Sequence, residues 1–272
     1  GLTRFQKRFP LRFFDVGIAE EHAVTFAAGL AAGGYKPYFA VYSSFLQRGF
    51  DEILHDVCIQ ELPVVFMIDR AGIVGSDGET HQGIFDYSYL NIIPGMTVMA
   101  PKNRLELMDM MEFANTFDRP VAIRYPRGAV SDIFDEHKED ISYGRAEVIY
   151  RGYGTAIMTI GASIEEGVKI YNKLKERGEN PTLINARFEN PVDEKLIGEL
   201  AGDHDKLLTV EENIGAGGFG MNVLRSVNEN GYDIRVVNAA LPDAYMTHGN
   251  VAKLKEMCGF TPDDIIKKLD RY

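Results

Sequence analysis

The sequence contains no tryptophan and only two cysteines, Cys58 and Cys258, in 272 residues. Cysteines so few and so far apart exclude a cysteine-based zinc site and a disulfide framework, so we expect a reduced, cytoplasmic protein. No run of about 18 apolar residues occurs, and no membrane span is predicted. Basic residues number 29 against 40 acidic ones, for a net charge of −11, so a nucleic-acid partner is not expected.

Short apolar runs alternate with helix-length amphipathic stretches, which is typical of parallel sheets with crossover helices. Strands of the first half are expected at residues 11–14, 38–42, 64–68, 97–100 and 121–125. Helices are expected at residues 20–32, 45–60 and 104–117, with Asn103 as the N-cap of the last.

The alternation breaks after Gly128 and resumes after a polar, acidic stretch. Strands of the second half are expected at residues 155–160, 182–186, 207–211 and 234–238, and helices at 164–177, 192–200, 219–228 and after Thr261-Pro262. We therefore predict an α/β protein of two doubly wound domains with mainly parallel sheets, residues 1–128 and 145–272. Residues 129–144 form the predicted interdomain linker.

Polar residues gather at predicted strand ends, where parallel sheets bind their ligands. The segment DVGIAEEH places Glu20 in the first turn of a helix; the alternative is that Glu20 and Glu21 only complement the helix dipole. The segment YSSFLQR, residues 42–48, also leads from a strand into a helix. Its alternative is a serine N-cap above a core phenylalanine.

The third such segment, DRAGIVGSDGETHQG at residues 69–83, combines four glycines with an arginine, two aspartates and a histidine. Glycines let a backbone approach a ligand closely. With RYPRG at residues 124–128, two or three guanidinium groups are expected on one rim, an arrangement suited to phosphate or carboxylate. The alternative role for each residue is to stabilise its loop.

These strings, together with EENIGAGGFG in the second half, resemble the thiamine-diphosphate-dependent transketolase family. The resemblance is to the branch that condenses pyruvate with glyceraldehyde 3-phosphate, with loss of CO2, to 1-deoxy-D-xylulose 5-phosphate for isoprenoid, thiamine and pyridoxal biosynthesis. It implies a thiamine-diphosphate pyrimidine-binding domain over residues 1–128 and a transketolase-like C-terminal domain over 145–272. The family's diphosphate-binding domain, with its Mg2+ motif, is not part of this sequence.

The resemblance therefore implies a separate N-terminal chain that binds the diphosphate and Mg2+, a homodimer of the full assembly, and no activity of this chain alone. It also implies cofactor contacts. Glu20 would hydrogen-bond the aminopyrimidine ring as a catalytic residue, and Phe45 would stack on that ring. Ile18 would contribute an apolar setting for the Glu20 carboxyl group.

The substrate residues implied by the resemblance are Tyr42, Arg48, Arg70, Asp77 and Arg127. Of these, Arg70 and Arg127 would bind the phosphate, because a dianion favours forked donors. Asp77 would bind an acceptor hydroxyl. His81 would act as a catalytic residue that relays protons.

Two motifs carry no assignment. The literal GxGxxG at residues 215–220 is not expected to bind a dinucleotide, because Asp233 precedes the strand that follows it, whereas such a site requires an acid at the end of that strand. The resemblance implies a glycine-rich turn of the C-terminal domain. Residues 76–78 with Asn103 match a magnesium motif only loosely, so no metal is assigned to this chain. Half of a split transketolase, the beta subunit of a 2-oxoacid dehydrogenase and a non-catalytic assembly module remain alternatives.

Overall fold

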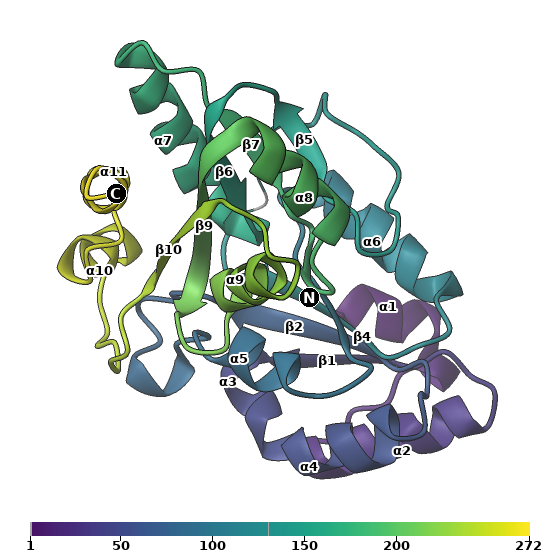
Figure 1. Ribbon diagram of the computed structural model, residues 1–272. Helices are drawn as coiled ribbons and strands as arrows, with labels where there is room; N and C mark the ends of the chain where they lie inside the picture. The colour runs from purple at the N-terminus through teal and green to yellow at the C-terminus, as the bar shows by residue number, and fades with distance from the viewer. Residues whose placement is uncertain (1, 130) are drawn as a thin grey trace.

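The computed structural model describes residues 2–129 and 131–272 (Figure 1). Residues 1 and 130, in the predicted first domain and linker, lie outside the described residues. The chain forms two five-stranded sheets, in the orders β1-β2-β4-β3-β8 and β10-β9-β6-β7-β5. The strands are β1 (Tyr38–Tyr42), β2 (Val65–Ala71), β3 (Thr97–Met99), β4 (Val121–Pro126), β5 (Glu147–Tyr150), β6 (Gly154–Thr159), β7 (Thr182–Asn185), β8 (Phe188–Asn190), β9 (His204–Ile214) and β10 (Arg235–Leu241).

Helices cover both faces of each sheet, as the sequence predicted for a doubly wound α/β fold. The first sheet lies between α2–α4 and α6, and the second between α7 and the pair α8 and α9 (Figure 1). The helices are α1 (Thr3–Arg8), α2 (Glu20–Ala32), α3 (Ser43–Leu46), α4 (Phe50–Glu52), α5 (Asp86–Asn91), α6 (Arg104–Thr116), α7 (Ile164–Glu176), α8 (Glu194–Asp203), α9 (Phe219–Glu229), α10 (Val251–Met257) and α11 (Pro262–Leu269). Within the described residues, no helix is both long and apolar enough to cross a bilayer.

Most predicted elements are confirmed, and the Asn103 side chain caps α6 by accepting from Glu106 N at 2.8 Å. The strand predicted at residues 11–14 is wrong. A 3-10 turn, η1 (Pro10–Arg12), occupies part of this stretch, and Leu11 is 91% exposed because no neighbouring strand covers it. The helix predicted at 45–60 is broken into α3, η2 (Gln47–Gly49), α4 and the π-helical η3 (Ile53–Cys58).

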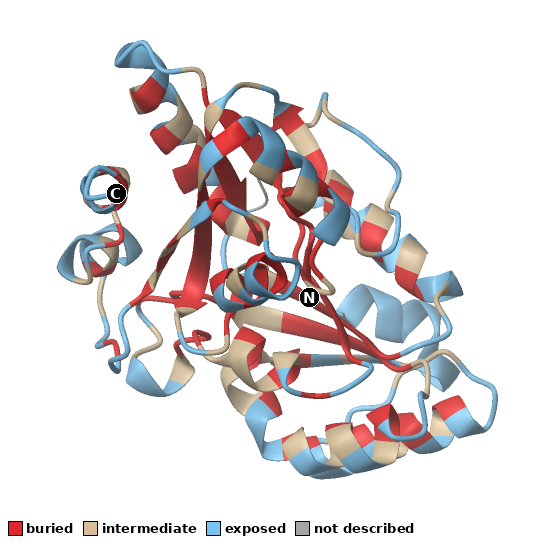
Figure 2. Cartoon of the chain, in the orientation of Figure 1, coloured by how far each residue is buried: buried red, intermediate tan, exposed pale blue. Residues whose placement is uncertain are grey.

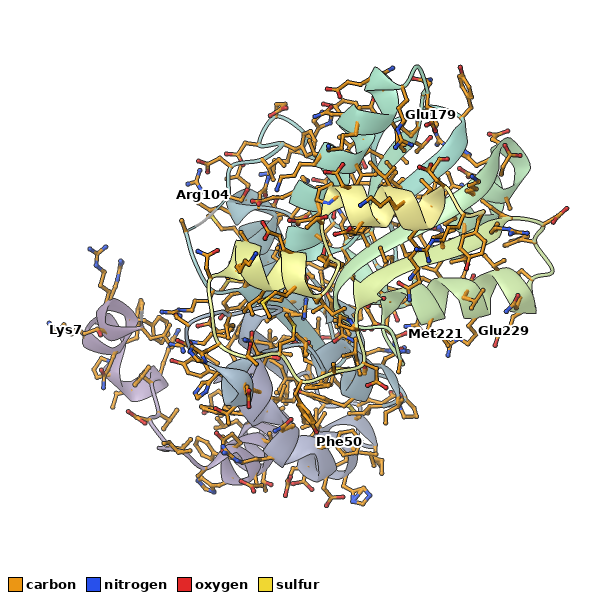
Figure 3. The ribbon with its side chains drawn as sticks, turned by 90° about the vertical axis from the view of Figure 1, so that its left-hand side faces the viewer. Lys7, Phe50, Arg104, Glu179, Met221 and Glu229 are labelled. Atoms are coloured by element: carbon orange, nitrogen blue, oxygen red, sulfur yellow. The ribbon has the colours of Figure 1, made fainter. Side chains whose placement is uncertain are left out.

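The N-terminal helix α1 was not predicted, and it buries none of its residues. Figure 3 shows it standing out from the rest of the chain, with the labelled Lys7 at its tip. Helices α5 and α10 and strands β5 and β8 were also not predicted. The two strands are short and pair antiparallel at sheet edges, so neither has the apolar run of a central parallel strand.

Strand β8 joins the two halves of the molecule, because it lies in the second half of the sequence and closes the first sheet. It pairs antiparallel with β3, with Met99 opposite Phe188 and Val98 opposite Asn190. Just before it, Arg187 O accepts from Ala100 N at 2.9 Å. The domain limits at residues 128 and 145 remain a prediction. The first sheet nevertheless includes β8, which lies after both limits in the sequence.

Buried residues make up most of the strands of both sheets and the sides of the helices that face them (Figure 2). A single apolar cluster runs from Val24 and Ile68 in the first half to Met158 and Phe219 in the second. Burial of apolar surface stabilises folding by about 25 cal/mol per Å2. The two halves therefore share a core, and each depends on the other for its burial.

A buried group of four charges also joins the halves. Lys102 Nζ lies 2.6 Å from Glu147 Oε2 and 3.3 Å from Glu106 Oε1, and Arg187 Nε lies 2.8 Å from the same Glu106 oxygen. All four side chains are at most 3% exposed. The two cations balance the charge of the two carboxylates, and this pairing allows all four side chains to be buried.

We expect Phe188→Ala to lower the free energy of unfolding by about 3–5 kcal/mol, because it leaves a cavity in the edge that joins both sheets. Phe188 is 1% exposed and packs edge-on against Phe113 and Tyr143, each with ring centroids 6.1 Å away. Urea unfolding would measure the change. Tyr153→Ala, at a 64% exposed position of the second half, is the control and should change stability little; equal losses would contradict the proposed role of β8.

Candidate active site

The residues predicted to form a site lie around the carboxyl ends of β1, β2 and β4. Strand β1 ends at Tyr42 and leads directly into α3, while β2 and β4 end at Ala71 and Pro126. Because these three strands are parallel neighbours, their last residues meet at one edge of the sheet. We call residues 72–83, which follow β2, the glycine-rich loop.

Glu20 is the first residue of α2 and is 6% exposed. Arg48 Nη1 donates to Glu20 Oε1 at 3.2 Å, and this arginine is half exposed. The pair orients the carboxylate by a charge-assisted hydrogen bond. Ile18, predicted to cover Glu20, instead has its side chain 86% exposed and does not enclose the carboxylate within this chain.

Phe45, on α3, links Glu20 and Arg48 to the glycine-rich loop. The Arg48 guanidinium lies 5.0 Å from the centre of the Phe45 ring. The rings of Tyr42 and His81 also lie against Phe45, with centroids 5.4 and 5.2 Å away, and His81 meets it edge-on. A half-buried aromatic surface therefore stands between the acid and the loop.

Asp77 joins the two arginines that were predicted to bind phosphate. Its Oδ2 pairs with Arg70, and its Oδ1 accepts from Arg127 Nη1 at 2.8 Å. The Arg70 guanidinium also lies 4.0 Å from the centre of the Tyr42 ring. Contacts thus run without a break from Glu20 to Arg127, and among the predicted site residues only Ile18 stands apart.

Arg70 has a backbone conformation that few residues other than glycine adopt, with φ of +59°. It sits where the register between β2 and β4 shifts, between Ile68 and Ala71. Asp69 Oδ1 accepts from Arg70 N at 2.7 Å and holds this turn. The sharp change of direction brings the Arg70 side chain over Tyr42 and toward Asp77.

Two of the guanidinium groups predicted on this rim, those of Arg70 and Arg127, converge there, whereas Arg124 does not join them. Its Nε donates to both carboxylate oxygens of Asp86, at 2.8 and 2.9 Å. Its Nη2 donates to Gly83 O at 3.0 Å and to Glu212 O at 2.7 Å. The side chain is buried, and these acceptors hold its Nε and Nη2 away from the rim.

Two more buried carboxyl groups share this region. Burial raises the pKa of Glu189 well above its ordinary value, and the Glu211 carboxylate raises it further. Burial also raises the pKa of Glu211, to about 7, although backbone donors at Gly220 and Phe219 oppose the shift. Arg124 supplies one positive charge near four carboxyl groups, those of Asp86, Glu189, Glu211 and Glu212.

Glu211 also explains the GxGxxG string. Its carboxylate accepts from Phe219 N at 2.7 Å and Gly220 N at 2.8 Å, at the first turn of α9. A helix N-terminus after a glycine turn can bind phosphate. Here an internal carboxylate takes that position, and a Cβ at Gly218 would clash with it.

Gln82 is a residue of the site region to which the sequence assigned no role. It is 3% exposed, and its Oε1 accepts from Val74 N at 2.9 Å. Its Nε2 donates to Thr247 O in the second half, also at 2.9 Å. Its position between a histidine and a glycine in the glycine-rich loop could have marked Gln82 as a candidate. The sequence could not have shown its partner, Thr247, because the two residues are 165 positions apart.

Within residues 2–129 and 131–272, no cluster of three or more histidine, cysteine or acidic side chains could hold a metal ion. Both cysteines are free, and burial raises the pKa of Cys58 to about 12.

Comparisons with known proteins identify both halves of the chain. Residues 1–132 match the transketolase pyrimidine-binding domain, and residues 144–265 match the transketolase C-terminal domain. Among solved structures, a split-gene transketolase described as an inactive beta4 tetramer superposes with a TM-score of 0.88 at 28% identity, covering 98% of this chain and 85% of that one. A transketolase from Campylobacter jejuni superposes with a TM-score of 0.78 at 17% identity, covering 95% of this chain and 39% of its own, and shows the fold alone.

Curated relatives are more similar in sequence. The 1-deoxy-D-xylulose-5-phosphate synthase of Lachnoclostridium phytofermentans is 50% identical over 272 residues, and that of Caldanaerobacter subterraneus is 47% identical over 273. Both alignments cover 100% of this chain and 44% of the relative. The chain therefore spans less than half the length of these relatives.

We expect Glu211 to make stability depend on pH. Its pKa is about 7 in the folded chain against an ordinary value of 4.5, so the folded chain holds a proton that the unfolded chain releases between these values. Its contribution is complete below about pH 4.5 and is lost as the pH rises through about 7. Relative to Glu211→Gln, which cannot ionise, the wild type should lose on the order of 1–3 kcal/mol between about pH 5 and about pH 8.

Urea unfolding of both proteins across this range would measure the difference. Glu229→Gln, at an exposed position at the end of the same helix α9, is the matched control. A constant difference between wild type and Glu211→Gln at all pH values would contradict the raised pKa.

Proposed function

Because this chain belongs to the transketolase family, with a pyrimidine-binding domain followed by a C-terminal domain, we propose that it forms part of a 1-deoxy-D-xylulose-5-phosphate synthase. Such an enzyme condenses pyruvate with glyceraldehyde 3-phosphate, with release of CO2. The observation that supports this most strongly is the unbroken line of contacts from buried Glu20 to the Arg70–Asp77–Arg127 group. One end suits a nitrogen heterocycle and the other a phosphorylated acceptor.

The residues at the Glu20 end fit thiamine diphosphate. A carboxylate that is 6% exposed, beside the half-buried ring of Phe45, matches an aminopyrimidine with a ring nitrogen and a flat face. When bound, thiamine diphosphate supplies a nucleophilic carbon and accepts the electron pair left as CO2 departs. Glu20 would hydrogen-bond the ring nitrogen, and Arg48 would hold the carboxylate in that direction through its 3.2 Å contact.

The residues at the other end fit the acceptor. Arg70 and Arg127 present guanidinium groups to one carboxylate, and forked donors of this kind bind phosphate well. A phosphate dianion would compete with Asp77 for them, which would free Asp77 for an acceptor hydroxyl. Tyr42, under the Arg70 guanidinium, adds a phenolic donor.

His81 would handle a proton at the aldehyde oxygen. Its Nδ1 lies 2.9 Å from Thr80 Oγ1, and its ring meets Phe45 edge-on between the cofactor and acceptor ends. Carbon–carbon bond formation puts negative charge on the aldehyde oxygen, and an imidazole within hydrogen-bond reach can protonate it.

The diphosphate and Mg2+ would be bound by residues outside this sequence. We propose a separate N-terminal diphosphate-binding chain as partner, supported by the split-gene transketolase among the structural neighbours. A homodimer of the full assembly and a cytoplasmic location belong to the same proposal, the latter supported by two free cysteines.

The alternatives fit less well. Identity to the split-gene transketolase is 28%, against 50% and 47% to the two synthases. The beta subunit of a 2-oxoacid dehydrogenase gains no support from these matches, which are synthases and transketolases. A non-catalytic assembly module has no physical need for a buried acid beside an aromatic face and an arginine pair.

We expect Glu20→Gln to abolish most turnover of the complete enzyme while leaving its fold intact, because the amide lacks the charge that favours the reactive tautomer of the aminopyrimidine. Steady-state rates with saturating pyruvate and glyceraldehyde 3-phosphate would measure this. Glu21→Gln is the matched control, since Glu21 is the next residue of α2 and is exposed. Near-normal turnover of Glu20→Gln would show that a group other than Glu20 favours the reactive tautomer.

We expect Arg70→Ala and Arg127→Ala each to lower kcat/KM for glyceraldehyde 3-phosphate about 30- to 150-fold, since a lost charge-assisted hydrogen bond costs about 2–3 kcal/mol. Unphosphorylated glyceraldehyde is the control acceptor, because it lacks the group that the arginines would bind. If kcat/KM falls by the same factor for both acceptors in each variant, the arginines shape the loop and do not bind phosphate.

A further inference from the structure

The C-terminal half holds the glycine-rich loop at three points. Glu212 Oε2 accepts from Ile73 N at 3.2 Å, Gly75 O accepts from Gly249 N at 3.2 Å, and the Gln82 side chain reaches Thr247 O at 2.9 Å. Figure 1 shows the yellow segment that precedes α10 descending beside the blue loop that follows β2. None of these C-terminal residues is among the predicted site residues.

Glu212 is the one charged side chain in these three contacts, and Lys255 fixes it. Lys255 Nζ lies 2.5 Å from Glu212 Oε1 and 3.0 Å from Glu166 Oε1. The side chains of Lys255 and Glu212 are 16% and 10% exposed. Burial by itself lowers the pKa of Lys255, but the carboxylates of Glu212 and Glu166 outweigh this and raise it, so the lysine keeps its charge.

The loop is built to let Glu212 approach. Gly72 has φ of +74°, and a Cβ there would lie 2.5 Å from Glu212 Oε2, so only glycine fits. Gly72 and Gly83 exchange backbone hydrogen bonds of 2.6 and 2.9 Å that close the root of the loop. The Glu212 carboxylate therefore meets the backbone where the loop begins, three residues after Arg70.

The loop between these anchors carries the acceptor residues Asp77 and His81, and Arg70 lies just before it. None of Glu212, Thr247, Gly249 and Lys255 contacts these three side chains through a hydrogen bond or ion pair within the part of the chain that the structure describes. Their effect on an acceptor must pass through the loop backbone.

We propose that Glu212 and Lys255 are positioning residues for the acceptor, which hold the glycine-rich loop in its binding conformation from the C-terminal half. This inference rests on the proposed function, because it takes Arg70, Asp77 and His81 to be the acceptor residues. A loop that is ordered in advance does not need to be ordered by the acceptor, so the ion pair contributes to acceptor affinity without touching it.

The test compares Lys255→Met with Lys255→Arg, which keeps the charge, and with Lys253→Met as matched control. Lys253 lies on the same helix α10 but is exposed and pairs with Glu256. Glu212→Gln is a second route, since it retains an oxygen that can accept from Ile73 N but loses the charge. Two quantities are measured: hydrogen exchange of the Ile73 amide, and KM and kcat of the complete enzyme for each substrate.

In Lys255→Met we expect the Ile73 amide to exchange about tenfold faster and KM for glyceraldehyde 3-phosphate to rise about tenfold. kcat and KM for pyruvate should stay within about twofold of wild type. Lys255→Arg should keep both the Ile73 exchange rate and the acceptor KM close to wild type. Glu212→Gln should give values between those of wild type and Lys255→Met, and Lys253→Met should change neither quantity. Slow exchange of core amides such as that of Phe66 verifies that each variant is folded.

Faster exchange at Ile73 without a change in acceptor KM overturns the positioning role. An unchanged Ile73 amide in both Lys255→Met and Glu212→Gln overturns the anchoring itself. If wild-type enzyme does not use glyceraldehyde 3-phosphate, the proposed function fails and the acceptor role fails with it, while hydrogen exchange on the same chain still decides whether the ion pair anchors the loop.

Discussion

The buried guanidinium of Arg124 is the interaction on which the arrangement of the molecule depends. A charge inside a protein is tolerated when it is paired and hydrogen-bonded. Here the acceptors come from three separate places: Asp86 at the start of α5, the carbonyl of Gly83 at the end of the glycine-rich loop, and the carbonyl of Glu212 in β9. Satisfying one side chain therefore fixes the loop, the first sheet and the second sheet relative to one another.

The contact between the halves is accordingly polar as well as apolar. Lys102 and Arg187 are neutralised by Glu106 and Glu147 in one group, and Arg124 lies among four carboxyl groups in the other. Charged groups of this kind leave few alternative packings, because a shifted contact would strand a charge without a partner. In the second group, burial raises the pKa of Glu189 and of Glu211, and the Glu211 carboxylate raises that of Glu189 further.

The candidate active site takes its form from the sheet edge above this frame. Parallel strands bring Tyr42, Ala71 and Pro126 to one edge, and the segments that follow them carry the polar side chains. The C-terminal half contributes no predicted site residue, yet its backbone and Glu212 hold the loop that carries Asp77 and His81. The side chains that would contact the substrate therefore lie in the first half, and residues that hold their loop lie in the second half.

The sequence by itself determined the α/β class and most of the helices and central strands. It also predicted a set of site residues, of which all but Ile18 lie along one line of contacts, while their roles stay a prediction. It did so because apolar periodicity and glycine placement are local properties, and because the glycine-rich loop is long and specific. Local pattern also misled, as at residues 11–14, where an apolar run has no neighbour to pair with. Tertiary structure alone decided that β8 closes the first sheet, that Arg124 turns inward to Asp86, and that Lys255 lies against Glu212. Each of these joins residues far apart in the chain, and whether a buried charge has a partner depends on what the fold brings beside it.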